Sequence, residues 1–411
     1  MAGLQGLLAT VSPAEGWTIR GGLFRSLYDD RSAFAHLLLD LEQDGSADRL
    51  IIADPRSRYV SISGELRASR AFTEGPRLHT VHLSYRGRNR RQRYGGSDVL
   101  DYGLTFIGET FTPSEPDFEF TEQNRDTVSQ SLYGIAYEGR WRGIGELSFG
   151  ISRTDYTKRF ELPAEQTIES EANPFVYNVS AAIELGPRLV AYTGYARGLE
   201  ESGIAPDQAA NRNQPLPAII TTQVDGGVRY RLTDDLNLSA GVFELRKPYF
   251  TLDAANDFGP VGETRNRGLE VSLAGAVTPR LNIVAGAVFL DPRVTGAEDA
   301  QFTIGERPVG LPSRLADLNI DWRTPFEGLS VDASVSHSGD IAARVDNSVF
   351  IPSRTIVNLG ARYRFELADR DATFRIQLLN AVNLYGFDLR GAGAYAPIAG
   401  RRISAYVTVD L

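Results

Sequence analysis

The sequence predicts an all-β protein, an antiparallel up-and-down transmembrane β-barrel. Three observations support this: apolar residues recur with a period of two, tight turns alternate with long polar segments, and no apolar stretch is long enough for a membrane-spanning helix. In the segment 267–290, Leu269, Val271 and Leu273 alternate with small or polar residues, and the alternation resumes after a turn at 278–280. Each such segment therefore predicts a strand with one apolar and one polar face.

The same alternation recurs towards the C-terminus. In "ADLNIDW", Leu318, Ile320 and Trp322 alternate with acidic and amide residues. "LSVDASVSHS" (329–338) and "TFRIQLL" (373–379) follow the same pattern. The polar faces carry Arg, Asp and Glu in the middle of strands, which is typical of a wide, wet interior and not of a small barrel filled by side chains.

The connections between the predicted strands alternate in length. Short turns are predicted at 12–16, 73–77, 139–143, 186–188, 233–235, 278–280, 324–328 and 368–371. Long polar segments lie near 29–56, 96–123, 157–173, 198–218, 247–263, 291–312, 339–352 and 382–400. Outer-membrane barrels have short periplasmic turns and long extracellular loops, so the apolar face is predicted to contact lipid. A soluble β-repeat protein, with apolar faces packed on each other, is the alternative.

The segments between these connections number about seventeen, many near the length of about ten residues that crosses an outer membrane. The last predicted strand, 401–411, ends on the periplasmic side. An odd number would place two strands of the same direction at the closing seam, which antiparallel closure does not allow. We therefore expect a partial barrel that lacks its first strands.

Composition excludes several classes of function. The net charge is −9, so no basic excess indicates a nucleic-acid partner, and the chain contains no cysteine for a disulfide or a thiolate metal site. The start, "MAGLQGLLATVSPAEG", lacks the cationic segment of a signal peptide. No nucleophile elbow, phosphate loop or metalloprotease motif occurs, so we do not expect an enzyme or a bound cofactor.

Several segments resemble the TonB-dependent outer-membrane receptors, most closely the ferric-siderophore receptor branch. They are "YTGYARGLEESGIAP" (192–206), "LPAIITTQVDGGVRYRL" (216–232), "RNRGLEVSLAG" (265–275), "GLPSRLADLNIDW" (310–322), "IQLLNAVNLYGFD" (376–388) and "GRRISAYVTVDL" (400–411). Their order and spacing are similar to those of the family, and the resemblance is strongest from about residue 190 onward.

The resemblance implies an outer-membrane barrel of about twenty-two strands that imports a scarce ligand, usually a ferric siderophore, with energy supplied through the TonB complex. Iron would enter only as part of the transported chelate. The family's signal peptide, TonB box and plug are not recognisable, so residues 1–411 are expected to be an N-terminally truncated barrel domain without its plug. A passive porin and a non-functional receptor fragment remain alternatives.

The resemblance also places a ligand site at the outer mouth, where aromatic and arginine side chains face an anionic chelate. The candidates in or directly beside the predicted outer loops are Arg246, Tyr249, Phe250, Phe258, Phe118, Phe120, Tyr385, Phe387 and Tyr395. Anchoring in the membrane interface is the competing role for these rings. The run "RGRNRRQRYGG" (86–96) provides Arg88, Arg90, Arg91 and Arg93 as candidates for an anionic ligand or for lipopolysaccharide phosphates.

No metal site is predicted. His79 and His82 are three positions apart on a probable strand, so their side chains point to opposite faces and cannot share a metal ion. The segment "DLEQDGSAD" (40–48) resembles a calcium loop in its acidic spacing, but Ile51 stands where an EF-hand has glutamate. A solvated outer loop is the interpretation that this segment favours.

Overall fold

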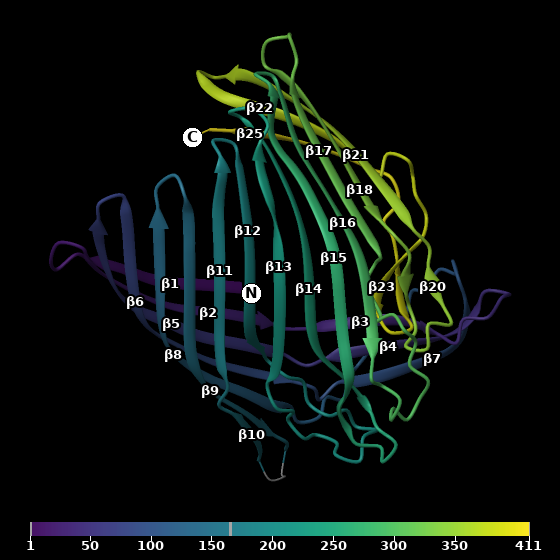
Figure 1. The fold of residues 1–411 in the computed structure, drawn as a ribbon. Helices are drawn as coiled ribbons and strands as arrows, with labels where there is room; N and C mark the ends of the chain where they lie inside the picture. The colour runs from purple at the N-terminus through teal and green to yellow at the C-terminus, as the bar shows by residue number, and fades with distance from the viewer. Residues whose placement is uncertain (1, 164–166, 411) are drawn as a thin grey trace. The chain divides into compact units, whose positions relative to one another are not determined.

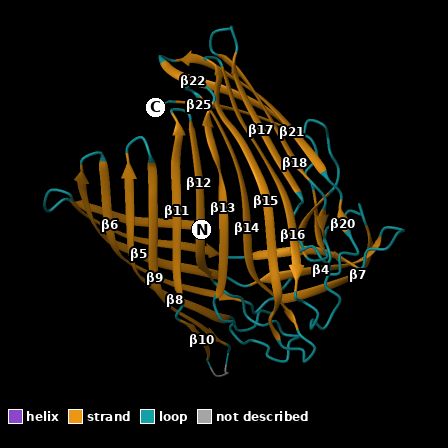
Figure 2. Cartoon of the chain, in the orientation of Figure 1, coloured by secondary structure: helices purple, strands orange, loops and turns teal. Residues whose placement is uncertain are grey.

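The computed structural model describes residues 2–163 and 167–410, and its regular structure is β-strand. Figure 2 shows these strands joined by loops and turns. In this described part of the chain, no helix has the length and apolar character needed to cross a membrane.

The strands follow one another along the whole chain. They are β1 (Ala2–Val11), β2 (Trp17–Asp30), β3 (Ala33–Leu39), β4 (Ser46–Asp54), β5 (Ser57–Glu74), β6 (Arg77–Tyr94), β7 (Asp98–Phe106), β8 (Asn124–Trp141), β9 (Gly145–Glu161), β10 (Ile168–Ala172), β11 (Phe175–Gly186), β12 (Leu189–Glu200), β13 (Ile219–Arg231), β14 (Leu236–Leu252), β15 (Phe258–Thr278), β16 (Leu281–Thr295), β17 (Arg314–Arg323), β18 (Leu329–Ser338), β19 (Ile341–Ala342), β20 (Phe350–Ile351), β21 (Arg354–Leu367), β22 (Arg370–Leu379), β23 (Phe387–Gly391), β24 (Ala394–Pro397) and β25 (Arg402–Val409).

The predicted connections are largely confirmed. Each of the eight predicted short turns joins two successive strands through a gap of at most five residues. Seven short strands form three small sheets within the predicted loops, β3–β4–β7, β19–β20 and β23–β24. If β10 and β11 are counted as one strand interrupted at 173–174, the remaining described strands number seventeen, as predicted.

Three predicted loops contain substantial parts of strands. In the segment 157–173, β9 continues to Glu161 and β10 spans Ile168–Ala172. The segments 247–263 and 291–312 were expected to be loops, but β14 continues to Leu252, β15 begins at Phe258 and β16 continues to Thr295. Proline residues occur in all three of these extensions, at Pro248, Pro260 and Pro292, and proline is depleted in strands, so the sequence indicated loops although the hydrogen-bonded ladder continues through them. The final strand is β25, and Leu411 lies outside the described residues.

The chain forms two compact units. The first comprises Met1–Glu138, Gly150–Tyr177 and Leu199–Ala218, and the second comprises Gly139–Phe149, Asn178–Gly198 and Ile219–Leu411.

The first unit contains an antiparallel meander in which β1, β2, β5 and β6 pair in order. The register places Leu23 opposite Leu7 and Ala68 opposite Leu83, so apolar residues meet on one face. Because alternate residues point to opposite faces, the other face receives polar pairs such as Ser63 opposite Arg88. We call these two faces of the sheet the apolar face and the polar face.

The second unit contains the longer meander, in which β13 to β18 run side by side (Figure 1). The pairing continues from β18 through β21 and β22 to β25. In the hairpin formed by β15 and β16, Leu269 lies opposite Phe289 and Val271 opposite Ala287. The predicted alternation of 267–290 is therefore confirmed, including the turn that follows Thr278.

The apolar face is exposed in both units and does not form an internal core. On this face, Leu66 and Leu83 of the first unit are 55% and 58% exposed, and Val242 and Phe289 of the second are 60% and 51% exposed. Contiguous exposed apolar surface of this extent marks an interaction with a membrane or a partner. The buried core is small by comparison and includes Ile341, Ala343 and Ile351 beneath the loops of the second unit.

Candidate functional site

Three arginines form a ladder along the polar face of β6. Arg86, Arg88 and Arg90 occupy alternate positions, and the register places them opposite Glu65, Ser63 and Ser61 of β5. Alternation along the strand keeps all three guanidinium groups on one face. This spacing gives a line of donors suited to carboxylate, hydroxamate or phosphate oxygens.

Three carboxylates, Glu65, Glu201 and Asp126, hold this ladder in place. Glu65 accepts contacts from Arg86 at 2.8 Å and from Arg67 at 2.7 Å. Glu201, from the segment that follows β12, contacts both Arg88 and Arg90.

At the Arg90 end, the ladder contacts a buried ion pair formed by Asp126 and Lys158. Arg90 contacts Asp126 of β8 at 2.8 Å, and the ammonium group of Lys158 on β9 lies 3.6 Å from the same carboxylate. The Lys158 side chain is 3% exposed and donates a hydrogen bond to the carbonyl oxygen of Ser202. Since isolated buried charges are costly, each of these groups depends on its partner.

Two polar atoms of this cluster are buried without a hydrogen-bond partner among the described residues. They are Oδ1 of Asp126 and Nε of Arg90. The hydrogen-bonding groups of the site are therefore not all satisfied by the protein alone. Each buried polar atom left unpaired costs roughly 1–3 kcal/mol. The site therefore has spare capacity for a ligand atom or for water.

Cations outnumber carboxylates in this group of side chains, which we call the polar-face patch. Its members are Arg67, Arg86, Arg88, Arg90 and Lys158, together with Glu65, Asp126 and Glu201. Five positive groups against three negative groups favour an anionic ligand.

The predicted cationic run 86–96 is divided between the two faces. Arg88 and Arg90 belong to the polar-face patch, whereas Arg91 lies opposite Val60 in the register of the apolar face. Arg93 is two positions further along the strand, on the same face as Arg91, and lies opposite Arg58. The four arginines therefore do not form one site.

The candidates on β14 and β15 also lie on different faces. We use parity for the odd or even position of a residue along its strand, which decides the face to which its side chain points. Arg246 has apolar-face parity and contacts Glu244, while Tyr249 has the opposite parity. The rings of Phe250 and Phe258 lie 6.3 Å apart between centroids. Arg246 therefore does not line the polar face beside Tyr249.

The remaining aromatic candidates form two local pairs and one hairpin contact. Phe118 and Phe120 stack with centroids 5.8 Å apart in the segment before β8. Tyr385 and Phe387 meet edge to face at 5.9 Å, and Tyr385 is 78% exposed. Tyr395 lies opposite Leu389 in the β23–β24 hairpin.

The structure confirms that the two strand histidines point apart. His79 contacts the hydroxyl group of Tyr137 at 2.7 Å, whereas His82 contacts Ser69 on the other face. In the segment 40–48, the carboxylate of Asp44 accepts hydrogen bonds from Ser46, which holds its pKa below the ordinary value. Among residues 2–163 and 167–410, no group of three or more acidic, histidine or cysteine side chains is arranged to hold a metal ion.

Sequence reasoning missed Asp126, Lys158 and Glu201. Four alternate residues of β9 are buried: Thr154, Tyr156, Lys158 and Phe160. The alternation of Tyr156 and Phe160 along the sequence could therefore have indicated that Lys158 points to the same buried face. The other two depend on contacts between distant segments. Strand parity alone does not reveal these contacts.

The sequence matches the family model "TonB dependent receptor-like, beta-barrel" over residues 4–384. The chain belongs to this TonB-dependent receptor family. Members are receptors and transporters of the bacterial outer membrane, so the exposed apolar face contacts lipid and the polar face lines the barrel interior.

Relatives and solved structures agree with this assignment. The ferrichrome receptor FcuA of Yersinia enterocolitica is 25% identical over 93% of this chain and 52% of its own length. The metal-pseudopaline receptor CntO of Pseudomonas aeruginosa is 22% identical over 64% of this chain and 38% of its own length. The chain therefore spans about half, or less, of the curated relatives that it matches.

The fold is also that of known receptor structures. The crystal structure of BauA, the ferric preacinetobactin receptor of Acinetobacter baumannii, matches with a TM-score of 0.84 at 20% identity, covering 100% of this chain and 63% of that one. The siderophore receptor PiuA of the same species matches with a TM-score of 0.82 at 16% identity, covering 98% of this chain and 63% of that one.

Proposed function

We propose that this chain is the barrel portion of an outer-membrane receptor for the uptake of a ferric siderophore or a similar scarce anionic ligand. The family assignment supports a receptor, and the relatives' names support siderophores. The observation that carries the proposal at residue level is the polar-face patch, where cations exceed carboxylates and two buried polar atoms lack partners.

Arg88 and Arg90 are the residues that we propose to contact the anionic ligand. Arg88 is 40% exposed at the side chain, and both arginines share the carboxylate of Glu201. An oxygen atom of an incoming chelate can replace a carboxylate oxygen of Glu201 at these arginines. Each guanidinium group then still has a hydrogen-bond acceptor, because charge-assisted hydrogen bonds form with either partner. Iron is cargo in this proposal, bound by the chelate and not by protein side chains.

Aromatic rings in the outer segments are proposed as secondary contacts. Tyr249 has polar-face parity, and the pairs Phe118–Phe120 and Tyr385–Phe387 present ring surface to the surroundings. Rings of this kind contact the apolar parts of a chelate. Energy supply through the TonB complex is likewise proposed from the family assignment.

The test is a titration of the full chain, folded into detergent micelles, with ferrichrome, ferrioxamine and a ferric catecholate. Quenching of tryptophan fluorescence reports binding, and heat-modifiable gel mobility reports folding. We expect saturable quenching by at least one ferric chelate and much weaker quenching by its iron-free form. A folded preparation that gives no saturable response to any of the three would contradict the proposal.

A further inference from the structure

A second group of arginines lies on the apolar face of the second unit, above its apolar residues. Along β14, Val242 is followed on the same face by Glu244 and Arg246, and along β15, Leu269 is preceded by Arg267 and Arg265. On β16, Phe289 is followed by Asp291 and Arg293, and Arg314 of β17 lies opposite Phe289. Three neighbouring strands thus change from apolar to charged at one level.

The carboxylates at this level do not balance the guanidinium groups. Glu244 contacts all three of Arg246, Arg265 and Arg267. Asp291 and Glu306 both contact Arg293, at 3.1 and 3.0 Å. Arg314 is exposed, and its side chain forms no ion pair within the described segments.

We call these side chains the apolar-face cluster: Glu244, Arg246, Arg265, Arg267, Asp291, Arg293, Glu306 and Arg314. It contains five arginines and three carboxylates. The next residue on this face of β15 is Glu263, and even with it the cations remain in excess. An anion near this surface is therefore attracted.

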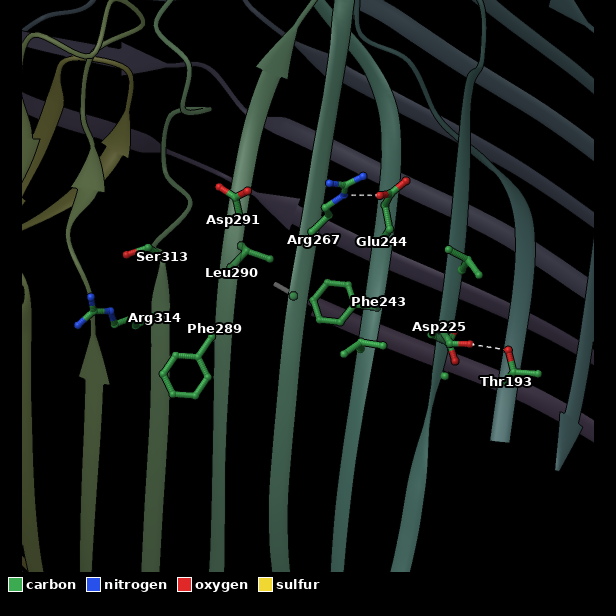
Figure 3. Close-up of a pocket in the computed structure, with 14 residues that line it drawn as sticks. Thr193, Asp225, Phe243, Glu244, Arg267, Phe289, Leu290, Asp291, Ser313 and Arg314 are labelled. Carbon is green, nitrogen blue, oxygen red and sulfur yellow. Dashed lines mark hydrogen bonds and ion pairs between the residues drawn. The ribbon is translucent and has the colours of Figure 1, made fainter. Parts of the chain in front are cut away.

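A groove of about 900 Å³ joins this cluster to the apolar surface (Figure 3). Val224, Val242 and Phe289 line its apolar part, and Glu244, Arg267, Asp291 and Arg314 line its charged part. Arg267 and Arg314 are contributed by different strands, so two guanidinium groups border one groove. The apolar part suits an acyl chain, and the excess of arginines in the apolar-face cluster around the groove suits an anionic headgroup.

The height of the cluster matches the edge of a membrane. On β16, the apolar-face positions from Leu281 to Phe289 span about 26 Å at about 3.3 Å per residue. At a strand tilt of about 40°, this is about 20 Å of membrane thickness, close to the apolar band of about 25 Å that such barrels present. Asp291 and Arg293 follow directly, at the end that bears the long loops and faces the outer leaflet.

We propose that the apolar-face cluster binds the phosphorylated headgroup of an outer-leaflet glycolipid, the lipid A part of lipopolysaccharide. The acyl chain would lie along Val224, Val242 and Phe289, and Arg267 and Arg314 would bind a phosphate group. Guanidinium groups bind phosphate oxygens through paired hydrogen bonds. The inference uses the outer-membrane location of the chain and is independent of the transported ligand.

The test measures binding of lipid A to the folded full chain in detergent by native mass spectrometry. The probes are bisphosphorylated lipid A, its dephosphorylated form and inorganic phosphate. The variants are Arg267→Gln/Arg314→Gln and, as a matched control, Arg323→Gln at the other end of β17. We expect the double variant to bind bisphosphorylated lipid A at least tenfold more weakly, and the control to bind it like the wild type.

The wild-type chain is also expected to prefer the bisphosphorylated form over the dephosphorylated form by at least tenfold. Equal binding by the wild type and the folded double variant would overturn the proposal, as would equal binding of the two lipid forms. Inorganic phosphate that competes at equal molar concentration would show a simple anion site without a lipid component, which also overturns it. If the double variant fails to fold, Arg314→Gln alone is expected to weaken binding about threefold. This single variant should fold, because the Arg314 side chain forms no ion pair with the described residues.

Discussion

The two arginine-rich regions of this chain have similar compositions but opposite surroundings. In the polar-face patch, Arg88 and Arg90 share the carboxylate of Glu201, and the Arg90 side chain is 17% exposed. In the apolar-face cluster, Arg267 is 54% exposed and lies directly beyond an apolar band. Strand parity, and not the density of arginine, decides whether a cationic group faces the barrel interior or the membrane.

The largest expected effect comes from breaking the buried pair of Asp126 and Lys158 within the polar-face patch. Lys158→Ala removes the ammonium group beside Asp126, which keeps its contact with Arg90, and also removes the donor to the buried carbonyl oxygen of Ser202. We expect the free energy of unfolding to fall by about 3–5 kcal/mol. Urea titration of the folded chain, followed by far-ultraviolet circular dichroism, measures this. Arg77→Ala, at an exposed turn 3.8 Å from Glu74, is the control and should change the free energy of unfolding by less than about 1 kcal/mol.

A somewhat smaller effect is expected from placing a charge on each face of β15. Val271→Arg puts a guanidinium group on the membrane-facing side and should cost about 2–4 kcal/mol in lipid. Ser272→Arg, one position along, points to the polar face and should cost much less. Equal losses of stability for the two variants in lipid vesicles would contradict the assignment of the faces.

One experiment can compare how much each of the two arginine regions contributes to binding of a ferric chelate. Arg88→Gln/Arg90→Gln is expected to weaken binding of a ferric chelate about tenfold, because a charge-assisted contact is lost. Arg267→Gln/Arg314→Gln is expected to leave chelate binding unchanged. Tryptophan quenching on both variants gives the comparison, and parallel losses in the two would show that parity does not separate the sites.

The smallest effect concerns the loops of the second unit. Arg307 donates hydrogen bonds to the side chain and to the carbonyl oxygen of Asp340, which lowers the pKa of that carboxyl group. A lowered pKa in the folded state stabilises the loops above the ordinary carboxyl pKa of about 4, and this contribution disappears as the pH falls through the lower folded value.

Hydrogen exchange of residues 339–349 should therefore be slow at pH 7 and faster, relative to intrinsic rates, near pH 3. Asp340→Asn is expected to remove this extra acid sensitivity. Unchanged acid sensitivity in that variant would assign the effect to another group.

The sequence was sufficient to predict the strands, but not the side-chain contacts between distant segments. Period two identified the apolar face of β15 from Leu269 and Val271, because a strand in a membrane must alternate. The same rule, extended from Leu83 and Tyr85 along β6, also separates Arg91 from Arg90. Parity was thus sufficient to divide the cationic run, although its density suggested one site.

Non-local contacts account for what could not be predicted. The pairing of Arg90 with Asp126 and Glu201 depends on how three distant segments pack together. The small sheets β19–β20 and β23–β24 lie in segments that carry no sustained alternation, because outside the membrane no apolar face is required. The candidate aromatic residues remain predictions, since only a bound ligand tests them.

Spin labelling along β15 tests the central claim most directly. The chain has no cysteine, so single cysteines at positions 269–274 can each carry a nitroxide in lipid vesicles. The assignment of faces predicts that accessibility to oxygen peaks at 269, 271 and 273, while accessibility to a water-soluble nickel reagent peaks at 270, 272 and 274. Loss of this alternation, or its reversal, would contradict a membrane-facing apolar surface.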